Sequence, residues 1–168
     1  MGTIVSKQIE FDMGHRVPNH KSKCKNLHGH RYKVEAGVEG IVSQERGASN
    51  EGMVIDFGDL KQVMMTEIHD RYDHGLMVYQ RDEFRALFDY MKKTGQNIHT
   101  VPFIPTAENL AEHFYKLMKD KLTDSRMDLK YVKVWETPTS TANFYKCSLE
   151  TKVNGGKSMA ELADDLNL

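Results

Sequence analysis

The chain has 168 residues, of which 39% are hydrophobic and 28% charged, and this is enough material for one domain whose core needs no disulfide bonds. A formal net charge of -1 excludes a general attraction to nucleic acid or to a membrane surface, so any role for charge must be local. Because two cysteines cannot form a disulfide framework and the N-terminus MGTIVSKQIEF lacks the apolar run of a signal peptide or membrane span, we expect a soluble, cytoplasmic protein.

Two segments near the N-terminus alternate apolar and polar residues with period two, which predicts half-buried strands. In the first segment, IVSKQIEFDMGH, His15 falls on the apolar parity at the C-terminal end. In the second, HGHRYKVEAGVEGIV, His28 and His30 share the parity of the apolar residues, so both project from one face. The loop 17–27 joins the two strands and carries Cys24, which favours an antiparallel hairpin with a long functional loop.

Three helical patterns follow in the middle of the chain. The segment 53–70, MVIDFGDLKQVMMTEIHD, predicts an amphipathic helix of about three turns. The segment 81–93, RDEFRALFDYMKK, predicts a second helix, and a third opens at PTAEN. In this third helix Thr106 is placed to cap the N-terminus, and Glu108 suits the positive end of the helix dipole.

Two further strands, LKYVKVWET (129–137) and ANFYKCSLE (142–150), are joined by the turn-forming PTST. Cys147 shares the apolar parity of the last strand and is expected in the core. The order of strand, strand, helices, strand, strand predicts an α+β domain with helices on one face of an antiparallel sheet. We expect one domain over residues 1–151 and a C-terminal tail over 152–168.

Three histidines fall on inward-facing positions of the two N-terminal strands: His15, His28 and His30. A single histidine on an apolar face is usually a hydrogen-bonded core residue, but an HxH pair beside a third histidine favours a metal. Zinc suits three imidazoles, and a fourth coordination position left open is typical of catalytic zinc. Such a zinc polarises a bound hydroxyl or carbonyl and lowers the pKa of a coordinated hydroxyl.

Cys24 has two interpretations. As a fourth ligand it would close a structural zinc site, although such sites usually use two to four thiolates and no second cysteine lies nearby. As a free thiol between Lys23 and Lys25 it is placed to ionise and to act as a base or nucleophile.

Residues 16–33 hold six basic residues and no acidic one. The six are Arg16, Lys21, Lys23, Lys25, Arg31 and Lys33. They form either a solvated loop or a site for the polyanionic tail of a substrate.

Six motifs occur in order across nearly the whole chain: FDMGHR, C-x3-HGH, DFGDLK, YDH, PTAENLA and VWET. Together they resemble the family of 6-carboxy-tetrahydropterin synthases and 6-pyruvoyl-tetrahydropterin synthases. The resemblance implies a tunnelling fold (T-fold), in which each subunit supplies a four-stranded antiparallel sheet with helices on one face, and the sheets join into an oligomeric barrel. It also implies a homo-oligomer, commonly a hexamer formed as a dimer of trimers, with active sites between subunits.

The resemblance assigns roles to individual residues. It makes His15, His28 and His30 the zinc ligands and Cys24 the catalytic base. A thiol outside the metal shell agrees with the interpretation of Cys24 as a free, ionisable group.

Five more residues receive roles from the same resemblance. Asp73 and His74 form the relay that activates the cysteine and moves protons, and a histidine oriented by a carboxylate suits that task. Glu136 anchors the amino-pyrimidine edge of the pterin, while Thr106 and Glu108 stand at the pocket wall.

The substrate that the resemblance implies is 7,8-dihydroneopterin triphosphate, whose tail the basic residues would attract. Enzymes of the carboxy type act as lyases that release acetaldehyde and triphosphate and serve 7-deazaguanine (queuosine) synthesis, whereas the pyruvoyl type only eliminates triphosphate. The C-x3-HGH spacing favours the carboxy type. The stretch 78–104 is longer than in compact members and is interpreted as an insertion with an extra helix. A competing hypothesis is a non-catalytic, zinc-stabilised module whose basic loop binds nucleic acid.

Overall fold

The computed structural model describes residues 2–146. Its strands are β1 (Thr3–His15), β2 (His28–Gly40), β3 (Gly75–Tyr79), β4 (Ile98–Val101), β5 (Met127–Thr137) and β6 (Ser140–Tyr145). Its helical segments are η1 (Lys23–Lys25), α1 (Phe57–Met64), η2 (Met65–His69), α2 (Asp70–Tyr72), α3 (Arg85–Lys93), α4 (Ala107–Met118) and η3 (Lys119–Lys121). Over these residues the strands form one six-stranded sheet in the order β4-β3-β1-β2-β5-β6.

The four long strands β1, β2, β5 and β6 are antiparallel neighbours, and this confirms the sheet predicted from the alternating patterns. The prediction was incomplete at the other edge. Residues 75–101 contribute the short strands β3 and β4, which run parallel to β1, in addition to the expected helix. Strands of five and four residues are too short to show a clear alternation, so the sequence pattern reveals only the helix between them.

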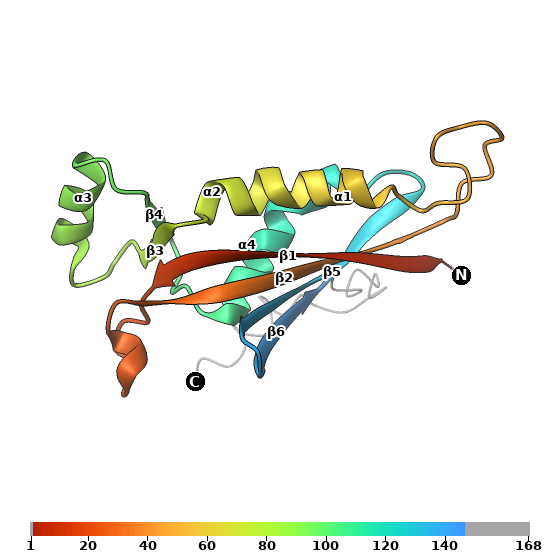
Figure 1. The fold of residues 1–168 in the computed structure, drawn as a ribbon. Helices are drawn as coiled ribbons and strands as arrows, with labels where there is room; N and C mark the ends of the chain where they lie inside the picture. Colours follow the sequence, from red (N-terminus) through yellow and green to blue (C-terminus); the bar gives the residue numbers. More distant parts are fainter. Residues whose placement is uncertain (1, 147–168) are drawn as a thin grey trace, which may run out of the picture.

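One face of the sheet carries the core. Alternate residues of β2 from Tyr32 to Val38 are fully buried, as are Val132 and Val134 of β5. They pack against Leu60 and Met64 of α1 and against further buried residues of η2 and α4, in a single cluster. Figure 1 shows α1 and α2 lying along the sheet, with α4 crossing behind β1. The expected layer of helices on one face is confirmed.

The first helix is longer than the three turns expected. The Asp56 side chain accepts a hydrogen bond from the Gly58 N–H at 2.6 Å and so caps α1. The π-helical segment η2 then continues the helix without a break into α2, which ends at Tyr72. Single π turns inside helices occur frequently next to functional sites, and Asp73 and His74 follow directly here.

Thr106 occupies the N-cap position of α4, but its side chain makes no capping hydrogen bond. The capping role predicted for this hydroxyl is therefore wrong. Its backbone carbonyl does accept the Leu110 N–H at 2.9 Å, and Glu108 lies in the first turn as expected. The Thr106 side chain is consequently available to line a hollow that it shares with Cys24.

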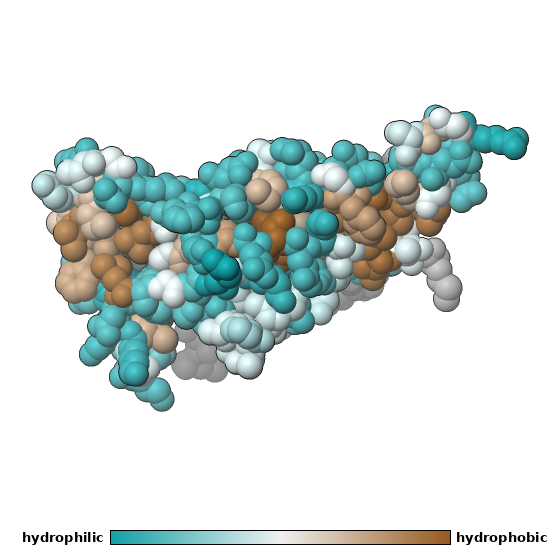
Figure 2. Space-filling model, in the orientation of Figure 1, coloured by the Kyte–Doolittle hydropathy of each residue, from teal (hydrophilic) through white to brown (hydrophobic). Residues whose placement is uncertain are grey.

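Helix α3 lies at the edge of the sheet beside β3 and β4. Phe88 is buried against Val78 and Ile98 in a small second cluster, whereas Phe84 and Leu87 are each 48% exposed. Figure 2 shows brown, hydrophobic surface at the left, where α3 lies in Figure 1. The helix predicted in the segment 81–93 is present over Arg85–Lys93, while residues 81–84 form the turn before it. Only part of the apolar stripe of this segment is covered.

Three predictions fall outside the described residues: the core position of Cys147, the last strand beyond residue 146, and the tail 152–168. Within residues 2–146, no helix combines the length and the apolar character needed to cross a membrane.

His113 of α4 is a titratable group packed between the helices. Its Nε2 lies 2.8 Å from the Tyr72 hydroxyl oxygen, and its ring contacts Phe103 and Phe114. Burial lowers the pKa of His113 to about 4, and the charges of Arg71 and Lys116 act in the same direction. The folded chain therefore holds this imidazole neutral.

We predict that His113→Gln makes unfolding less dependent on pH. The folded pKa of about 4 lies below the ordinary value of 6.5, so between these values the unfolded chain binds the extra proton. The neutral imidazole's contribution to the free energy of unfolding is fully present above pH 6.5 and is lost as the pH falls toward 4. Gln keeps a partner for Tyr72 but does not titrate. With a discount for solvent screening, the metal-free variant should lose about 1 kcal/mol less than the parent between pH 7 and pH 4.5 in urea unfolding. Equal losses would contradict the assignment.

Candidate metal centre and active site

The three predicted ligands come together where β1 ends and β2 begins. The strands pair in a register that sets His15 opposite His28 and Met13 opposite His30. One ring nitrogen from each of the three histidines lies within 4.8 Å of the other two. The Nε2 atoms of His15 and His28 are 3.1 Å apart. Two imidazoles bound to one tetrahedral zinc at ~2.05 Å place their nitrogens about 3.3 Å apart, so the geometry fits a metal.

Backbone carbonyls orient two of these rings. The Nδ1 of His15 lies 2.7 Å from the Pro105 carbonyl oxygen, and the Nδ1 of His28 lies 2.8 Å from that of Asn26. Because a carbonyl only accepts hydrogen bonds, each Nδ1 must carry the proton. Both Nε2 lone pairs then point to the same place, where a cation would stabilise them. A hydrogen bond from Nδ1–H to a carbonyl is the usual support of a metal-binding histidine.

Burial keeps the rings in the ligating form. It is the main reason why the pKa of His15 is lowered to about 4; the hydrogen bond to Pro105 opposes this effect, and the charges of His28 and His30 act with it. Burial also lowers the pKa of His30, although the Glu136 carboxylate opposes the effect. Neutral imidazole is the form that binds a metal.

Glu136 of β5 points to the same place as the histidines. Its Oε1 lies 3.7 Å from the His15 Nε2, and its side chain is partly buried, as its shared parity with Val132 and Val134 predicts. Two hollows meet at Glu136. One, of about 420 Å³, is also lined by His30 and Trp135, and the other, of about 240 Å³, by Cys24.

The smaller hollow collects several predicted residues. Cys24, Thr106, Glu108 and Glu136 line it together, with His20 as an addition that sequence analysis missed. Cys24 is half-buried in η1. Among residues 2–146, the cluster of potential metal ligands contains one ring nitrogen from each of the three histidines. The Cys24 sulfur is not part of this cluster. This arrangement favours a free thiol over a fourth metal ligand.

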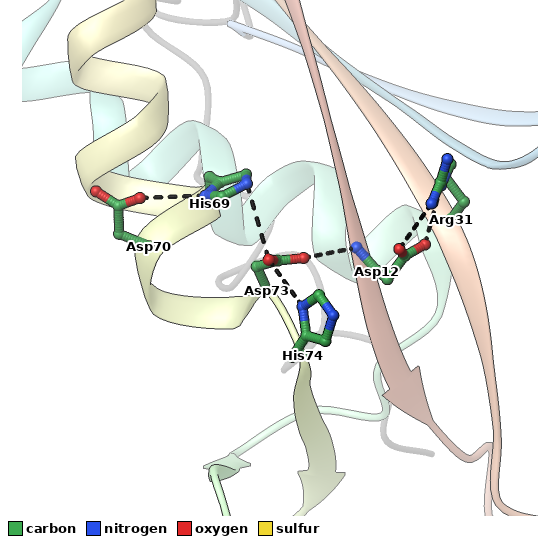
Figure 3. Close-up of polar contacts among 6 residues, drawn as sticks. All are labelled: Asp12, Arg31, His69, Asp70, Asp73 and His74. Carbon is green, nitrogen blue, oxygen red and sulfur yellow. Dashed lines mark hydrogen bonds and ion pairs between the residues drawn. The ribbon is translucent and has the colours of Figure 1, made fainter.

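Asp73 and His74 form a pair at the end of α2 (Figure 3). The Asp12 N–H donates to the Asp73 Oδ1 at 2.9 Å, and the His74 Nδ1 lies 2.8 Å from the Asp73 Oδ2. The hydrogen bond from Asp12 lowers the pKa of Asp73, and the bond from His74 adds to the effect. The carboxylate thus stays ionised and leaves the His74 Nε2 free for another group.

The His74 backbone is strained. Its φ of 56° lies in the left-handed region, and its N–H donates to the Asp12 carbonyl at 2.7 Å. A non-glycine residue held there costs energy and is often functional. The side chain is 81% exposed and lines a third hollow with His30 and Arg31. His74 and Cys24 line different hollows of this chain.

The six basic residues of 16–33 do not act as one patch. Arg16 is buried in ion pairs with Asp82 and Glu83, and Arg31 pairs with Asp12 through two hydrogen bonds. The exposed cations that remain are mainly the lysines of the η1 loop: Lys21, Lys23 and Lys25. The sequence shows the charges but not their partners, because the partners lie far away along the chain.

Comparison with known proteins places the chain among pterin enzymes. A family model described as 6-pyruvoyl tetrahydropterin synthase matches residues 4–147. The 6-carboxy-5,6,7,8-tetrahydropterin synthase of Haemophilus influenzae is 33% identical over 141 residues, which cover 83% of this chain and 96% of that protein. The protein of the same name from Rickettsia felis is 37% identical over 134 residues, covering 79% of this chain and 93% of that protein.

Solved structures agree on the fold. An uncharacterized protein from Wolinella succinogenes superposes with a TM-score of 0.70 at 22% identity, covering 88% of this chain and 99% of that chain. The 6-pyruvoyl tetrahydropterin synthase of Caenorhabditis elegans superposes with a TM-score of 0.60 at 23% identity, covering 88% of this chain and 97% of that chain. The predicted T-fold is confirmed.

The geometry predicts that His28→Ala and Cys24→Ala differ in metal binding. Removing one of three ligands should weaken divalent metal binding at least ~100-fold, whereas removing a thiol outside the cluster should change it less than about threefold. Competition between the protein and a chromophoric chelator for Zn²⁺ measures both affinities. If Cys24→Ala lost the metal as His28→Ala does, the thiol would be a ligand and the open site would be refuted.

Proposed function

Because the chain belongs to the 6-pyruvoyl tetrahydropterin synthase family, we propose that it is a zinc-dependent lyase that forms 6-carboxy-5,6,7,8-tetrahydropterin. The substrates would be 7,8-dihydroneopterin triphosphate and one water molecule, with acetaldehyde and triphosphate as further products, in 7-deazaguanine (queuosine) biosynthesis. The relatives from H. influenzae and R. felis carry the carboxy name, in agreement with the C-x3-HGH spacing. The observation that carries the proposal is the cluster of three histidines beside Glu136.

Zinc is the metal that the donor set supports, since all three ligands are neutral imidazole nitrogens. When bound, zinc would supply Lewis-acid polarisation of the side-chain hydroxyls of the substrate. His15, His28 and His30 would hold the ion, and the Pro105 carbonyl keeps the His15 ring in orientation.

Glu136 is proposed to anchor the pterin. The amino-pyrimidine edge of a pterin presents N–H donors, and a partly buried carboxylate accepts them. This residue stands between the metal ligands and the Cys24 hollow, so an anchored ring would bring its side chain toward the metal. Thr106 and Glu108 line the wall of that hollow and would complete the pocket.

Cys24 is proposed to remove and return protons beside the ring, with Asp73 and His74 as its relay. Since Cys24 and His74 line different hollows, the relay of one subunit would serve the thiol of another. This requires a homo-oligomer, for which the family resemblance implies a hexamer. The exposed lysines of the η1 loop flank the thiol and would attract the triphosphate.

The alternative product is 6-pyruvoyl-tetrahydropterin. The description of the matching family model favours this second product. The two reactions differ in carbon-carbon cleavage, so acetaldehyde distinguishes them.

We predict that the zinc-loaded protein releases acetaldehyde from 7,8-dihydroneopterin triphosphate, detected by NADH oxidation with alcohol dehydrogenase. Cys24→Ala should lower kcat at least ~100-fold while the zinc remains. Glu136→Gln should lower kcat/KM at least ~100-fold, because an amide cannot accept every donor of the pterin edge.

The matched control is Glu10→Gln, which removes another carboxylate of the larger hollow and should stay within about twofold of the parent. Triphosphate release without acetaldehyde would replace the carboxy reaction by the pyruvoyl one. No turnover by a zinc-loaded parent would refute the proposed function.

A second prediction concerns the shared site. Cys24→Ala and His74→Ala should each be inactive as pure proteins. After co-refolding of equal amounts, random association gives up to about a quarter of the sites an intact cysteine and an intact histidine from different subunits. Recovered turnover at that level supports a site between subunits, and a mixture that stays inactive contradicts it.

A further inference from the structure

Arg16 follows the metal ligand His15 directly and is only 2% exposed. Its guanidinium donates to the Asp82 Oδ1 at 3.0 Å and to the Glu83 Oε1 at 2.7 Å, and it lies 4.4 Å from the centre of the Phe84 ring. A buried arginine needs such partners, because an uncompensated charge is strongly destabilising there. All three partners belong to the turn after β3, within the stretch interpreted as an insertion.

The turn holds Asp82 in a fixed position. The side chain of Asp82 is fully buried, and its Oδ1 also accepts the Phe84 N–H at 2.8 Å. The Asp82 N–H donates to the Tyr79 carbonyl at 3.0 Å. Strand β3, which leads into the turn, pairs with the end of β1 and sets Met77 beside His15. The Asp82 carboxylate therefore contacts Arg16 from a turn whose position is fixed by the pairing of β3 with β1.

Arg16 stands between the two halves of the proposed site. On one side is His15, whose ring belongs to the metal cluster. On the other is Val17, whose N–H donates to the Cys24 carbonyl at 2.8 Å and attaches the η1 loop to the end of β1. A displacement of the Arg16 backbone would shift one or both of these neighbours, since planar peptide bonds fix the separation of consecutive Cα atoms.

We propose that Arg16 is a positioning residue: its buried ion pair with Asp82 fixes the chain segment that sets both the metal ligand His15 and the Cys24 loop. The consequences of this inference for catalysis rest on the proposed function. The residues of the turn after β3 would then help to position the active site, in addition to connecting β3 to α3.

The test compares Asp82→Asn with Glu83→Gln. Each substitution neutralises one of the two carboxylates that pair with the Arg16 guanidinium. The Asp82 side chain is buried, whereas the Glu83 side chain is 65% exposed. For Asp82→Asn we expect Zn²⁺ affinity in chelator competition to fall at least ~10-fold and the Co²⁺ absorption band at saturating metal to shift. Turnover should fall in kcat with KM within about twofold, because Glu136 on β5 is untouched. Glu83→Gln should match the parent in all three measurements.

A second measurement needs no metal, because it follows the rate at which Cys24 is alkylated. In a Cys147→Ser background, the metal-free protein is treated with iodoacetamide, and we expect Asp82→Asn to alkylate at least ~3-fold faster as the η1 loop loosens. If Asp82→Asn fails to fold, the double variant Arg16→Met with Asp82→Leu removes the buried charges together and keeps an apolar filling. The same metal and alkylation changes are expected from it.

A folded Asp82→Asn or double variant with parental metal affinity, Co²⁺ spectrum and alkylation rate would overturn the inference. So would equal effects of Asp82→Asn and Glu83→Gln, because the buried pair would then have no special part. Failure of the proposed function is a separate outcome: the parent would lack zinc-dependent turnover, and the alkylation rates would still decide whether Asp82 and Arg16 position the loop.

Discussion

In the pairing of β1 with β2, His15 lies opposite His28 and Met13 opposite His30, and the candidate site depends on this register. Side chains alternate along a strand, so a slip of one residue would turn both β2 histidines to the other face of the sheet. The core prevents such a slip. The Phe11 and Tyr32 rings stack on the buried face of the same two strands, and the same slip would turn the Tyr32 ring out of the core. The register that buries the core is thus also the register that brings the three histidines together.

Register alone does not decide which nitrogen of each ring is free. That choice is made by carbonyl groups that regular hydrogen bonding leaves available. The Pro105 carbonyl lies just before α4 and accepts from His15, and the Asn26 carbonyl lies in the loop before β2 and accepts from His28. Loops at the ends of elements therefore complete the site that the strands begin.

Periodicity in the sequence was sufficient to predict which side chains share a face of the sheet. The alternation in β1 and β2 placed the three histidines on one face, and the alternation in β5 placed Glu136 with them. The patterns did not reveal contacts made across long separations. The Pro105 carbonyl is 90 residues from His15, and Asp82 is 66 residues from Arg16.

Other differences have a physical reason as well. Thr106 has the residue type of a cap, but only the three-dimensional orientation of its side chain decides whether the hydroxyl reaches a backbone N–H. The strands β3 and β4 are short and are held by pairing with β1 and with each other, which no local pattern encodes. The basic run 16–33 was a correct count of charges, but burial of Arg16 and pairing of Arg31 leave a smaller exposed patch.

Asp12 holds the Asp73–His74 pair in place. Its N–H donates to Asp73 and its carboxylate pairs with Arg31 (Figure 3). Its carbonyl accepts the His74 N–H. The two peptide contacts hold His74 in a left-handed conformation with its ring exposed. The left-handed conformation is therefore fixed by the fold itself. In the relay proposed above, a second subunit with its own Cys24 would be the partner of this exposed imidazole.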